Sequence, residues 1–197
     1  MSGPFTKREG EGVNLSGPAV GLVETTSIAR GLVVADAMVK RALVRLAMAR
    51  PVTPGKHVVI VTGDVGEVDE AMKAGLAAAA HTLVDSLHLA NAHVALLAAL
   101  HKGCWTASCD ALGIVETFSV ASTLLGADAA CKASEVELVE LRLADGLGGK
   151  AYFAITGELA LVEAGVIAAE RALASGLLFT REIIARPHAD LIAALRR

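Results

Sequence analysis

The chain repeats itself, and this internal repeat constrains its fold more than any other sequence feature. Residues 21–29 read GLVETTSIA, and 92 residues later residues 113–121 read GIVETFSVA. The same spacing relates ADA at 35–37 to ADA at 127–129, and Lys40 to Lys132, with about half of the aligned positions identical. Self-similarity over so long a span predicts two copies of one structural unit.

The spacing grows along the chain, which locates the differences between the copies. Lys150 follows Lys56 by 94 residues, and ARPH at 185–188 follows ANAH at 90–93 by 95 residues. The second copy therefore has a longer loop before its lysine. These limits predict a flexible N-terminal tail at 1–19, a first domain at 20–103, a linker at 104–111 and a second domain at 112–197.

The patterns within each copy predict an α/β (α+β) unit. Residues 20–24 are typical of a strand, and Ser27 is a suitable N-cap for the helix that follows. Apolar residues then recur at steps of four and three, which indicates the buried stripe of an amphipathic helix. They are Ile28, Leu32, Ala35, Val39 and Ala42. Further along we expect strands at 44–48, 57–62 and 82–87, a turn at 51–56, and helices at 63–79 and 93–100.

Composition excludes several classes of protein. Hydrophobic residues make up 54% and charged residues 20% of the chain, which is enough apolar material for a core. The net charge of −3 and the six aromatic residues argue against nucleic-acid binding, which needs basic surfaces and stacking rings. The apolar fraction therefore comes from small and aliphatic residues, which suit close packing.

No membrane span or secretory signal is expected. The longest stretch without charges, residues 86–101, is shorter than the roughly 18 residues that a membrane helix needs. The N-terminal residues are polar and contain no apolar signal core. Three cysteines do not suggest a disulfide framework, so we expect a reducing, cytoplasmic location.

The repeated phrases resemble the shell proteins of bacterial microcompartments. The first copy contains GLVETTSIARG, ADAMVKRA and RPVTPGK, and the second contains GIVET, ADAACK, GLGGK and RPH in the same order. Two such units in one chain resemble the tandem BMC-domain class. The resemblance implies two unpermuted domains, each with a four-stranded, mainly antiparallel sheet and about three helices.

The same resemblance implies an assembly and a function. Tandem members form homotrimers that imitate the hexamers of single-domain relatives, and these pseudohexameric tiles form a shell with other hexameric and pentameric shell proteins around encapsulated enzymes. The loop before the lysine surrounds a pore for small metabolites. Carried over to this chain, the pore-lining residues are Thr53, Pro54, Gly55, Asp145, Gly146, Leu147, Gly148 and Gly149. Asp145 adds three negative charges to the rim, which we expect to disfavour small anions.

Contacts between tiles in this family involve a helix lysine and the RPH phrase. The matching residues are Lys40, Lys132, Arg186 and His188, with Asn91 and His93 at the places of Arg186 and His188 in the first copy. Because Asn91 replaces arginine, half of the edges differ from the other half. We expect neighbour choice to differ between these edges.

Two other functions remain open from the sequence. Some tandem shell proteins hold an iron–sulfur cluster through a pore-loop cysteine, but the matching loops here contain no thiol. Cys131 aligns with Val39 on a helix, so we expect a buried structural thiol, while Cys104 and Cys109 form only a loose pair. We therefore predict no cofactor and no metal. A trimeric small-molecule sensor is the second alternative, because fold does not determine function.

We do not expect an enzyme. The polar residues that recur in both copies are the only candidates for catalysis, and structural residues would recur in the same way. They are Glu24, Asp36, Lys40 and His93, with Glu116, Asp128, Lys132 and His188 in the second copy. No nucleotide-binding, hydrolase or metalloprotease motif is present.

Overall fold

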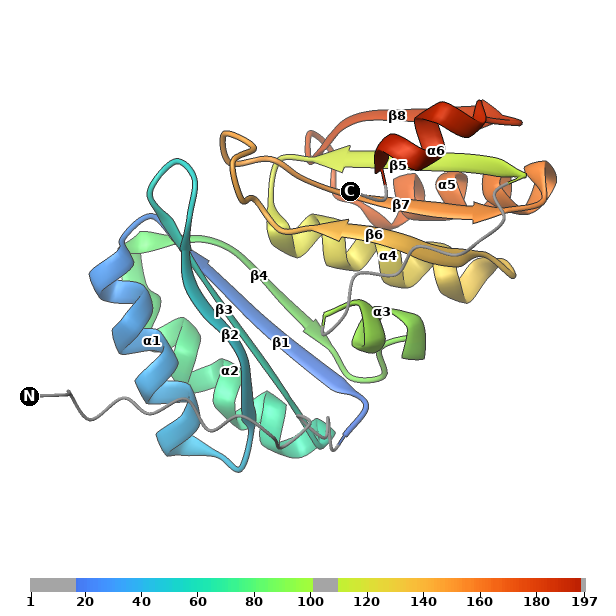
Figure 1. Ribbon diagram of the computed structural model, residues 1–197. Coiled ribbons are helices and arrows are strands. Elements are labelled where there is room, and N and C mark those ends of the chain that lie inside the picture. The colour runs from blue at the N-terminus through green and yellow to red at the C-terminus, as the bar shows by residue number, and fades with distance from the viewer. Residues whose placement is uncertain (1–16, 101–109, 196–197) are drawn as a thin grey trace, which may run out of the picture.

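Each repeat forms one antiparallel sheet with two helices on one of its faces (Figure 1). The computed structural model describes residues 17–100 and 110–195. Most of the N-terminal tail and Cys104 and Cys109 of the linker lie outside the described residues.

The two repeats have the same order of elements. The first contains β1 (Ala19–Thr25), α1 (Ile28–Arg41), β2 (Arg45–Val52), β3 (Lys56–Gly63), α2 (Val65–Ala79), a short 3-10 helix η1 (Ala80–Thr82), β4 (Leu83–Leu89) and α3 (Val94–Ala99). The second contains β5 (Ala111–Thr117), α4 (Val120–Ala133), β6 (Glu137–Arg142), β7 (Ala151–Gly157), α5 (Leu159–Ala172), β8 (Leu178–Ala185) and α6 (Ala189–Leu195). The strand orders are β2-β3-β1-β4 and β6-β7-β5-β8, so the predicted unpermuted four-stranded units are confirmed.

Glycines in the central strands allow the helices to pack closely. A Cβ atom on Gly21 of β1 would lie 2.8 Å from Sδ of Met72 in α2. A Cβ atom on Gly113 of β5 would lie 2.7 Å from Cγ1 of Val162 in α5. Small residues at these positions bring each helix directly onto the sheet backbone. This close approach explains how the core is filled with few aromatic rings.

The predicted core stripe of the first helix is correct for Ala35 but wrong for most of its other members. The side of α1 that faces its own sheet contains Gly31, Val34, Ala35 and Met38. Ile28, Leu32 and Val39 are instead 43%, 57% and 40% exposed. Helix α1 therefore has two apolar sides. Most residues of the predicted stripe lie on the side that faces away from its own sheet.

Several element limits also differ from those predicted. Ser27 is the N-cap of α1, as expected, and accepts a hydrogen bond from the Arg30 backbone N–H at 3.2 Å. The turn predicted at 51–56 contains only Thr53–Gly55, because Pro51 and Val52 still pair with β3. The fourth strand continues to Leu89, where it lies opposite Val20, because the ladder with β1 extends that far.

A buried histidine distinguishes the first core from the second. His57 of β3 is fully buried, neither ring nitrogen has a hydrogen-bond partner among the described residues, and a Cβ atom on Gly31 would lie 2.4 Å from its ring. The second repeat has Ala151 and Thr123 at these places. There the Thr123 hydroxyl fills the space and lies 2.6 Å from the hydroxyl of Thr117. One repeat therefore pairs a large strand residue, His57, with a glycine on the helix. The other pairs a small strand residue, Ala151, with the larger Thr123 on the helix.

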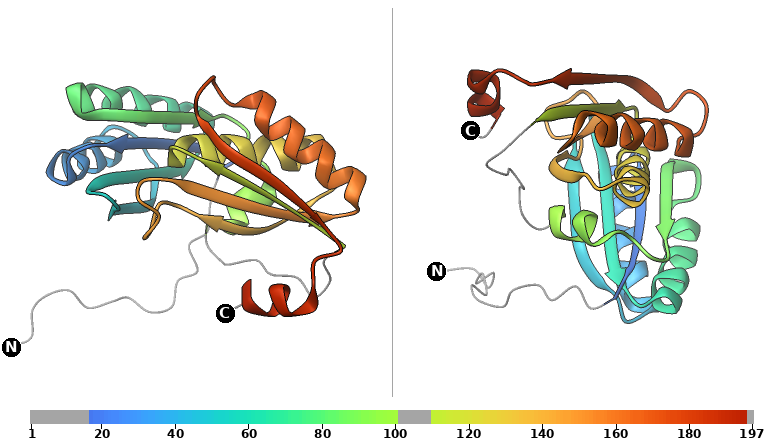
Figure 2. Two further views of the ribbon diagram at one scale, coloured as in Figure 1. Left: turned by 90° about the horizontal axis from the view of Figure 1, so that it is seen from above. Right: turned by 90° about the vertical axis from the view of Figure 1, so that its right-hand side faces the viewer.

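One apolar cluster is shared by the two repeats. We call the sheet face that is not covered by the repeat's own helices its open face. The open face of the first sheet, with Val20, Leu22 and Ile60, packs against helix α4 of the second repeat. Figure 2 shows α4 lying between the two sheets. We call this contact the repeat junction. Over residues 17–100 and 110–195, no helix is long and apolar enough to cross a membrane.

His57 predicts that stability depends on pH. Burial lowers the pKa of its imidazole below the usual value, so the unfolded chain binds the proton more strongly than the folded chain. The contribution of His57 to the free energy of unfolding is therefore complete above about pH 6.5 and is lost as the pH falls below that value. Urea denaturation between pH 5 and 8 measures this change.

The His57→Phe variant removes the titrating group and keeps a planar ring. We expect a smaller loss of stability at acid pH than in the wild type. His88→Gln, at an exposed position of β4, is the matched control and leaves the pH dependence unchanged. Equal acid sensitivity in His57→Phe and the wild type would show that other groups cause the effect.

Candidate functional site at the hairpin loops and the repeat junction

The two predicted pore loops lie side by side at one end of the molecule (Figure 1). Loop 53–55 joins β2 to β3, and the longer loop before Lys150 joins β6 to β7. The Gly146 backbone N–H donates a hydrogen bond to Oγ1 of Thr53 at 3.3 Å. A Cβ atom on Gly149 would lie 3.1 Å from Cδ of Pro54, a tight contact, and its φ of +92° favours glycine. The structure thus brings together loops that are about 90 residues apart in the sequence.

The charge of Asp145 is compensated within the chain. Its carboxylate forms an ion pair with the Arg50 guanidinium at 2.7 Å, and both side chains are about half exposed. Each Asp145 charge expected near the rim is therefore accompanied by a positive charge, because Arg50 from the other repeat lies next to this loop. Sequence reasoning missed Arg50, which carries no signal beyond being a strand arginine close to the turn.

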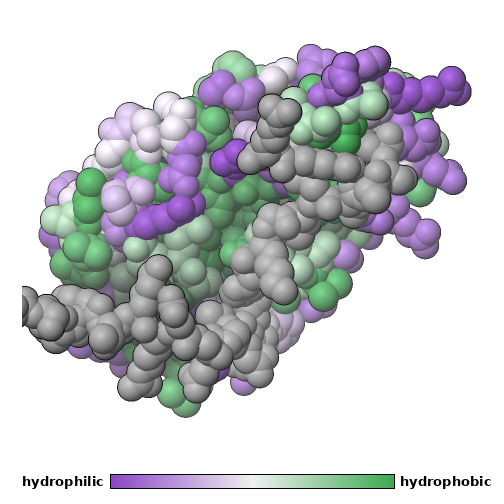
Figure 3. Space-filling model, viewed as in Figure 1, coloured by the Kyte–Doolittle hydropathy of each residue, from purple (hydrophilic) through white to green (hydrophobic). Residues whose placement is uncertain are grey.

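A hollow of about 520 Å³ opens beside the same loops, between β2 and β6. Its lining combines small and aliphatic side chains with charged groups at the rim. The lining includes Ala47, Met48, Leu141, Leu143, Arg50, Arg142 and Asp145. Figure 3 shows hydrophobic surface in the middle of this side of the molecule, bordered by hydrophilic residues. The hollow lies on the repeat junction, so its shape depends on how the two repeats pack.

A buried glutamate holds the repeat junction together. Glu24 at the end of β1 is fully buried, and its carboxylate pairs with Nζ of Lys56 at 2.8 Å. Its other oxygen accepts a hydrogen bond from the backbone N–H of Val120 at 3.1 Å. Val120 is the first residue of α4, where unpaired backbone N–H groups and the helix dipole favour an anion. Glu24 therefore joins the first sheet, the first loop and the helix of the second repeat.

Further polar contacts surround this glutamate. Asp85 of β4 accepts hydrogen bonds from the hydroxyls of Ser119 and Ser122 at the start of α4. Sequence reasoning missed Asp85, although its place directly opposite Glu24 in the β1–β4 ladder follows from the strand register. The start of α4 is therefore enclosed by acidic groups of the first repeat.

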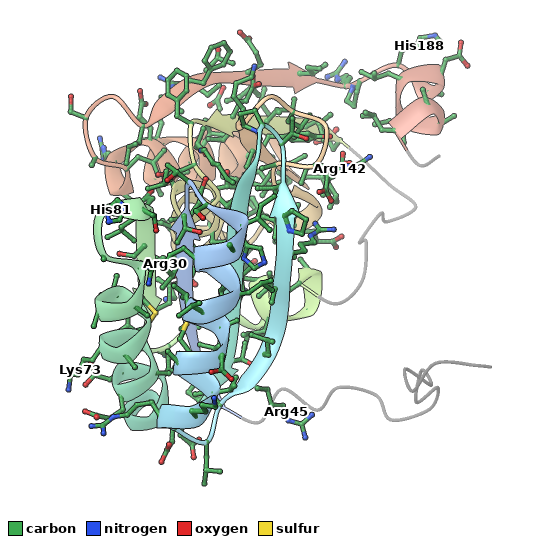
Figure 4. All side chains as sticks on the ribbon, turned by 90° about the vertical axis from the view of Figure 1, so that its left-hand side faces the viewer. Arg30, Arg45, Lys73, His81, Arg142 and His188 are labelled. Carbon is green, nitrogen blue, oxygen red and sulfur yellow. The ribbon has the colours of Figure 1, made fainter. Side chains whose placement is uncertain are left out.

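The predicted edge residues fall into two groups. In the first group, the Lys132 ammonium donates hydrogen bonds to the Asn91 carbonyl and to Asp128, each at 2.6 Å, and Asp128 accepts one from the His93 backbone N–H at 2.7 Å. In the second group, Lys40 pairs with Asp36 at 2.6 Å. Arg186 and His188 are not brought to Lys40 within the chain, and Figure 4 shows His188 at the outer end of the second repeat.

The repeated polar residues are engaged in structural contacts. Glu24, Asp128 and Lys132 hold the repeat junction, and Glu116 pairs with Lys150 as Glu24 pairs with Lys56. Within residues 17–100 and 110–195, no three His, Cys, Asp or Glu side chains are close enough to hold a metal ion. Cys131 is buried as predicted, and burial, together with the nearby Asp128 charge, raises the pKa of its thiol to about 11. This thiol therefore stays protonated at neutral pH.

Comparison with known proteins gives a consistent result. A family model described as the BMC domain matches residues 19–92 and again residues 111–187. The bacterial microcompartment shell protein PduT of Citrobacter freundii is 42% identical over 174 residues, which cover 88% of this chain and 95% of that protein. The bacterial microcompartment shell protein PduA of Salmonella typhimurium is 48% identical over 61 residues, or 31% of this chain and 65% of its own length.

Solved structures agree with these matches. A crystal structure of a microcompartment protein from Desulfitobacterium hafniense superposes with a TM-score of 0.79 at 43% identity, covering 88% of this chain and 97% of that one. A fused permuted hexameric shell protein, MSM0275 of the RMM microcompartment, superposes with a TM-score of 0.56 at 20% identity, covering 78% of this chain and 80% of that one. The second likeness concerns the fold alone.

The role of Glu24 can be tested by removing its charge. We expect Glu24→Gln to lower the free energy of unfolding by about 1–3 kcal/mol, because Lys56 and the start of α4 lose a buried anionic partner. Urea denaturation followed by circular dichroism, at a low protein concentration, measures the change.

Glu116→Gln is the matched control, because Glu116 occupies the same place in the second repeat but is partly exposed. Its expected loss is below about 1 kcal/mol. Equal losses in the two variants would contradict a specific role for Glu24 in joining the repeats.

Proposed function

Because the chain belongs to the BMC-domain family of bacterial microcompartment shell proteins, we propose that three copies close into a flat pseudohexameric tile with a central pore for small metabolites. The tile is a structural component of the shell. We place it in the bacterial cytoplasm, in a shell built together with other shell proteins.

One observation carries the proposal. Each chain repeats the two surfaces that form the repeat junction, on α1 and on the second sheet, and these second copies have no partner repeat against them. The outer side of α4 is covered, with Val120 and Leu124 fully buried, whereas the matching residues Ile28 and Leu32 of α1 are exposed. The open face of the second sheet carries a small apolar cluster in which Leu112 is buried, partly under Leu195 of α6, whereas Ile114 and Ile184 are half-buried. These residues match the part of the first sheet that covers α4. The open face of one copy therefore fits α1 of the next copy.

Repeating this contact in a head-to-tail manner produces a ring or a filament. Six domains in a ring require three chains, which agrees with the hexamers that the family resemblance implies for single-domain members. Relatives such as PduA align with about one repeat of this chain. Closed symmetry is the usual outcome for homo-oligomers. In a closed ring, the outer side of every α1 helix is covered by the second sheet of a neighbouring copy.

The two loops supply the pore lining in this arrangement. Thr53, Pro54 and Gly55 alternate with Asp145, Gly146, Leu147, Gly148 and Gly149 around the axis, because both loops lie at the same end of their sheets. Backbone N–H groups of glycine-rich loops can donate hydrogen bonds to polar solutes. The unequal loop lengths make the opening threefold rather than sixfold.

The tile edges are proposed at the residues that recur beside the first helix of each repeat. Lys40 and Lys132 keep exposed ammonium groups while pairing with aspartates one helical turn earlier. Arg186 and His188, and Asn91 and His93 in the first repeat, complete the edges. Arginine occurs at position 186, but the matching position 91 is asparagine, so alternate edges of the tile differ in charge.

The two alternative functions are not favoured. The proposed pore loops contain no cysteine, so they offer no thiolate for an iron–sulfur cluster. The described cysteine, Cys131, is buried in the helix α4 with a raised thiol pKa. A sensor role has no support from the relatives, whose names describe shell proteins.

Native mass spectrometry and electron microscopy test whether the protein forms this tile. We expect a mass about three times the 20.2 kDa of the chain and six-lobed discs that associate into sheets. Leu32→Asp places a charge on the exposed side of α1 and should reduce the mass to that of one chain.

Leu43→Asp is the matched control, because Leu43 is 89% exposed just beyond α1 and lies outside the proposed contact. This variant should stay trimeric. A monomeric wild type, or a trimeric Leu32→Asp variant, would contradict the proposed arrangement.

The ion pair beside the pore predicts opposite effects of two variants. Asp145→Asn releases the charge of Arg50, and Arg50→Gln releases the charge of Asp145, each three times per tile. We expect anion-over-cation selectivity to rise about two- to fivefold in the first and to fall by a similar factor in the second. The reversal potential of tiles in a planar bilayer under a KCl gradient measures this ratio. A shift of the same sign in both variants would exclude this role.

A further inference from the structure

We propose that Arg30 of one copy pairs with Glu182 of the next copy, and that this ion pair stabilises the contact between neighbouring copies in the ring. The inference rests on the proposed trimer and goes beyond it. It states that the contact between chains differs chemically from the junction within a chain. The partner is a second copy of this chain, oriented with its second sheet toward α1.

The junction within the chain shows where Arg30 would lie. Asp85 accepts hydrogen bonds from Ser119 and Ser122 at the start of α4. The repeat equates Asp85 with Thr180, because these residues lie opposite Glu24 and Glu116 in the matching ladders. It equates Ser122 with Arg30. When the junction recurs between chains, Thr180 of one copy therefore lies next to Arg30 of another.

Glu182 lies on the same face of β8 as Thr180. It is directly opposite Ile114, which belongs to the apolar cluster of the open face. Two residues along a strand span about 6.6 Å, a distance that an arginine side chain can bridge. Glu182 and Arg30 are both exposed, and neither has an ion-pair partner within the described parts of the chain. Each charge is therefore available for a partner on another copy.

The surface around Arg30 has the form of an unfilled socket. A hollow of about 370 Å³ is lined by Ser27, Ala29, Arg30, Val33, His81 and Thr82. Figure 4 shows Arg30 and His81 close together at this end of the first repeat. In the second repeat, the matching residues Ala121 and Ser122 are only 2% and 3% exposed, because the first repeat covers them. The hollow at Arg30 and the covered surface at Ser122 are therefore equivalent places in the two repeats, and only the second has a neighbouring repeat packed against it.

The residues at these places are neutral in the junction within the chain and charged in the proposed contact between chains. Within the chain, Leu87 and Ser122 occupy the positions that correspond to Glu182 and Arg30. Leu87 is 8% exposed and belongs to the shared core. Because α4 of the same chain already covers the first sheet, only the second sheet, with Glu182, is free to meet Arg30 of another copy. The pair therefore adds a charged contact between chains that the junction within the chain lacks.

Charge reversal tests the pair in the full-length protein. Arg30→Glu and Glu182→Arg should each raise the concentration at which half of the trimer dissociates by at least about tenfold. The combined variant should return to within about threefold of the wild type. Mass photometry over a dilution series, at low and high salt, measures these concentrations. High salt should weaken the wild type and the combined variant alike.

Two variants and one measurement serve as controls. Arg45→Glu and Glu163→Arg reverse exposed charges outside the proposed contact and should leave dissociation unchanged. Circular dichroism shows whether each variant is folded. If Arg30→Glu does not fold, Arg30→Gln provides a milder change at the same position.

The outcomes separate the two proposals. A wild type that never forms trimers contradicts the proposed function itself. A trimeric wild type with unaffected single variants, or with no rescue in the combined variant, overturns the Arg30–Glu182 pair and leaves the trimer standing.

Discussion

The rest of the structure depends on the burial of the first sheet's open face against helix α4. A four-stranded sheet with helices on one side leaves its other apolar side in water, so it needs a second layer. In this chain the second repeat provides that layer, and Glu24 reinforces it through Lys56 and the backbone of Val120. The same packing brings the two hairpin loops together and forms the hollow between β2 and β6. It also leaves the outer side of α1 exposed, with Ile28 at 43% and Leu32 at 57%, and leaves Ile114 and Ile184 of the second sheet half-buried.

Divergence between the repeats follows this division of roles. Positions in each core changed in a compensating way, as His57 and Gly31 in one repeat replace Ala151 and Thr123 in the other. Positions on the two open faces changed in polarity, since Leu87 of the first corresponds to Glu182 of the second. A face that is always covered within the chain can be fully apolar. A face that meets another chain must also stay soluble before assembly, which favours charged residues there.

The site is built from loops and ion pairs rather than from a reactive cluster. The repeated acids and lysines that resemble catalytic candidates are used to join elements, as Asp128 and Lys132 show at the junction. At the loops, Arg50 and Asp145 come from different repeats and compensate each other. These features fit a structural shell component, in agreement with its membership of the BMC-domain family.

The sequence by itself determined the number of units, the order of their strands and helices, the N-cap at Ser27 and the burial of Cys131, because these follow from local pattern and internal alignment. It misjudged the inner side of α1: Ile28, Leu32 and Val39 are apolar but exposed, since periodicity reports that a side is to be covered and not by which partner. Only the tertiary structure paired Arg50 with Asp145 and Glu24 with Val120. These partners are more than 90 residues apart, and only the packing of one repeat on the other brings them within hydrogen-bond distance.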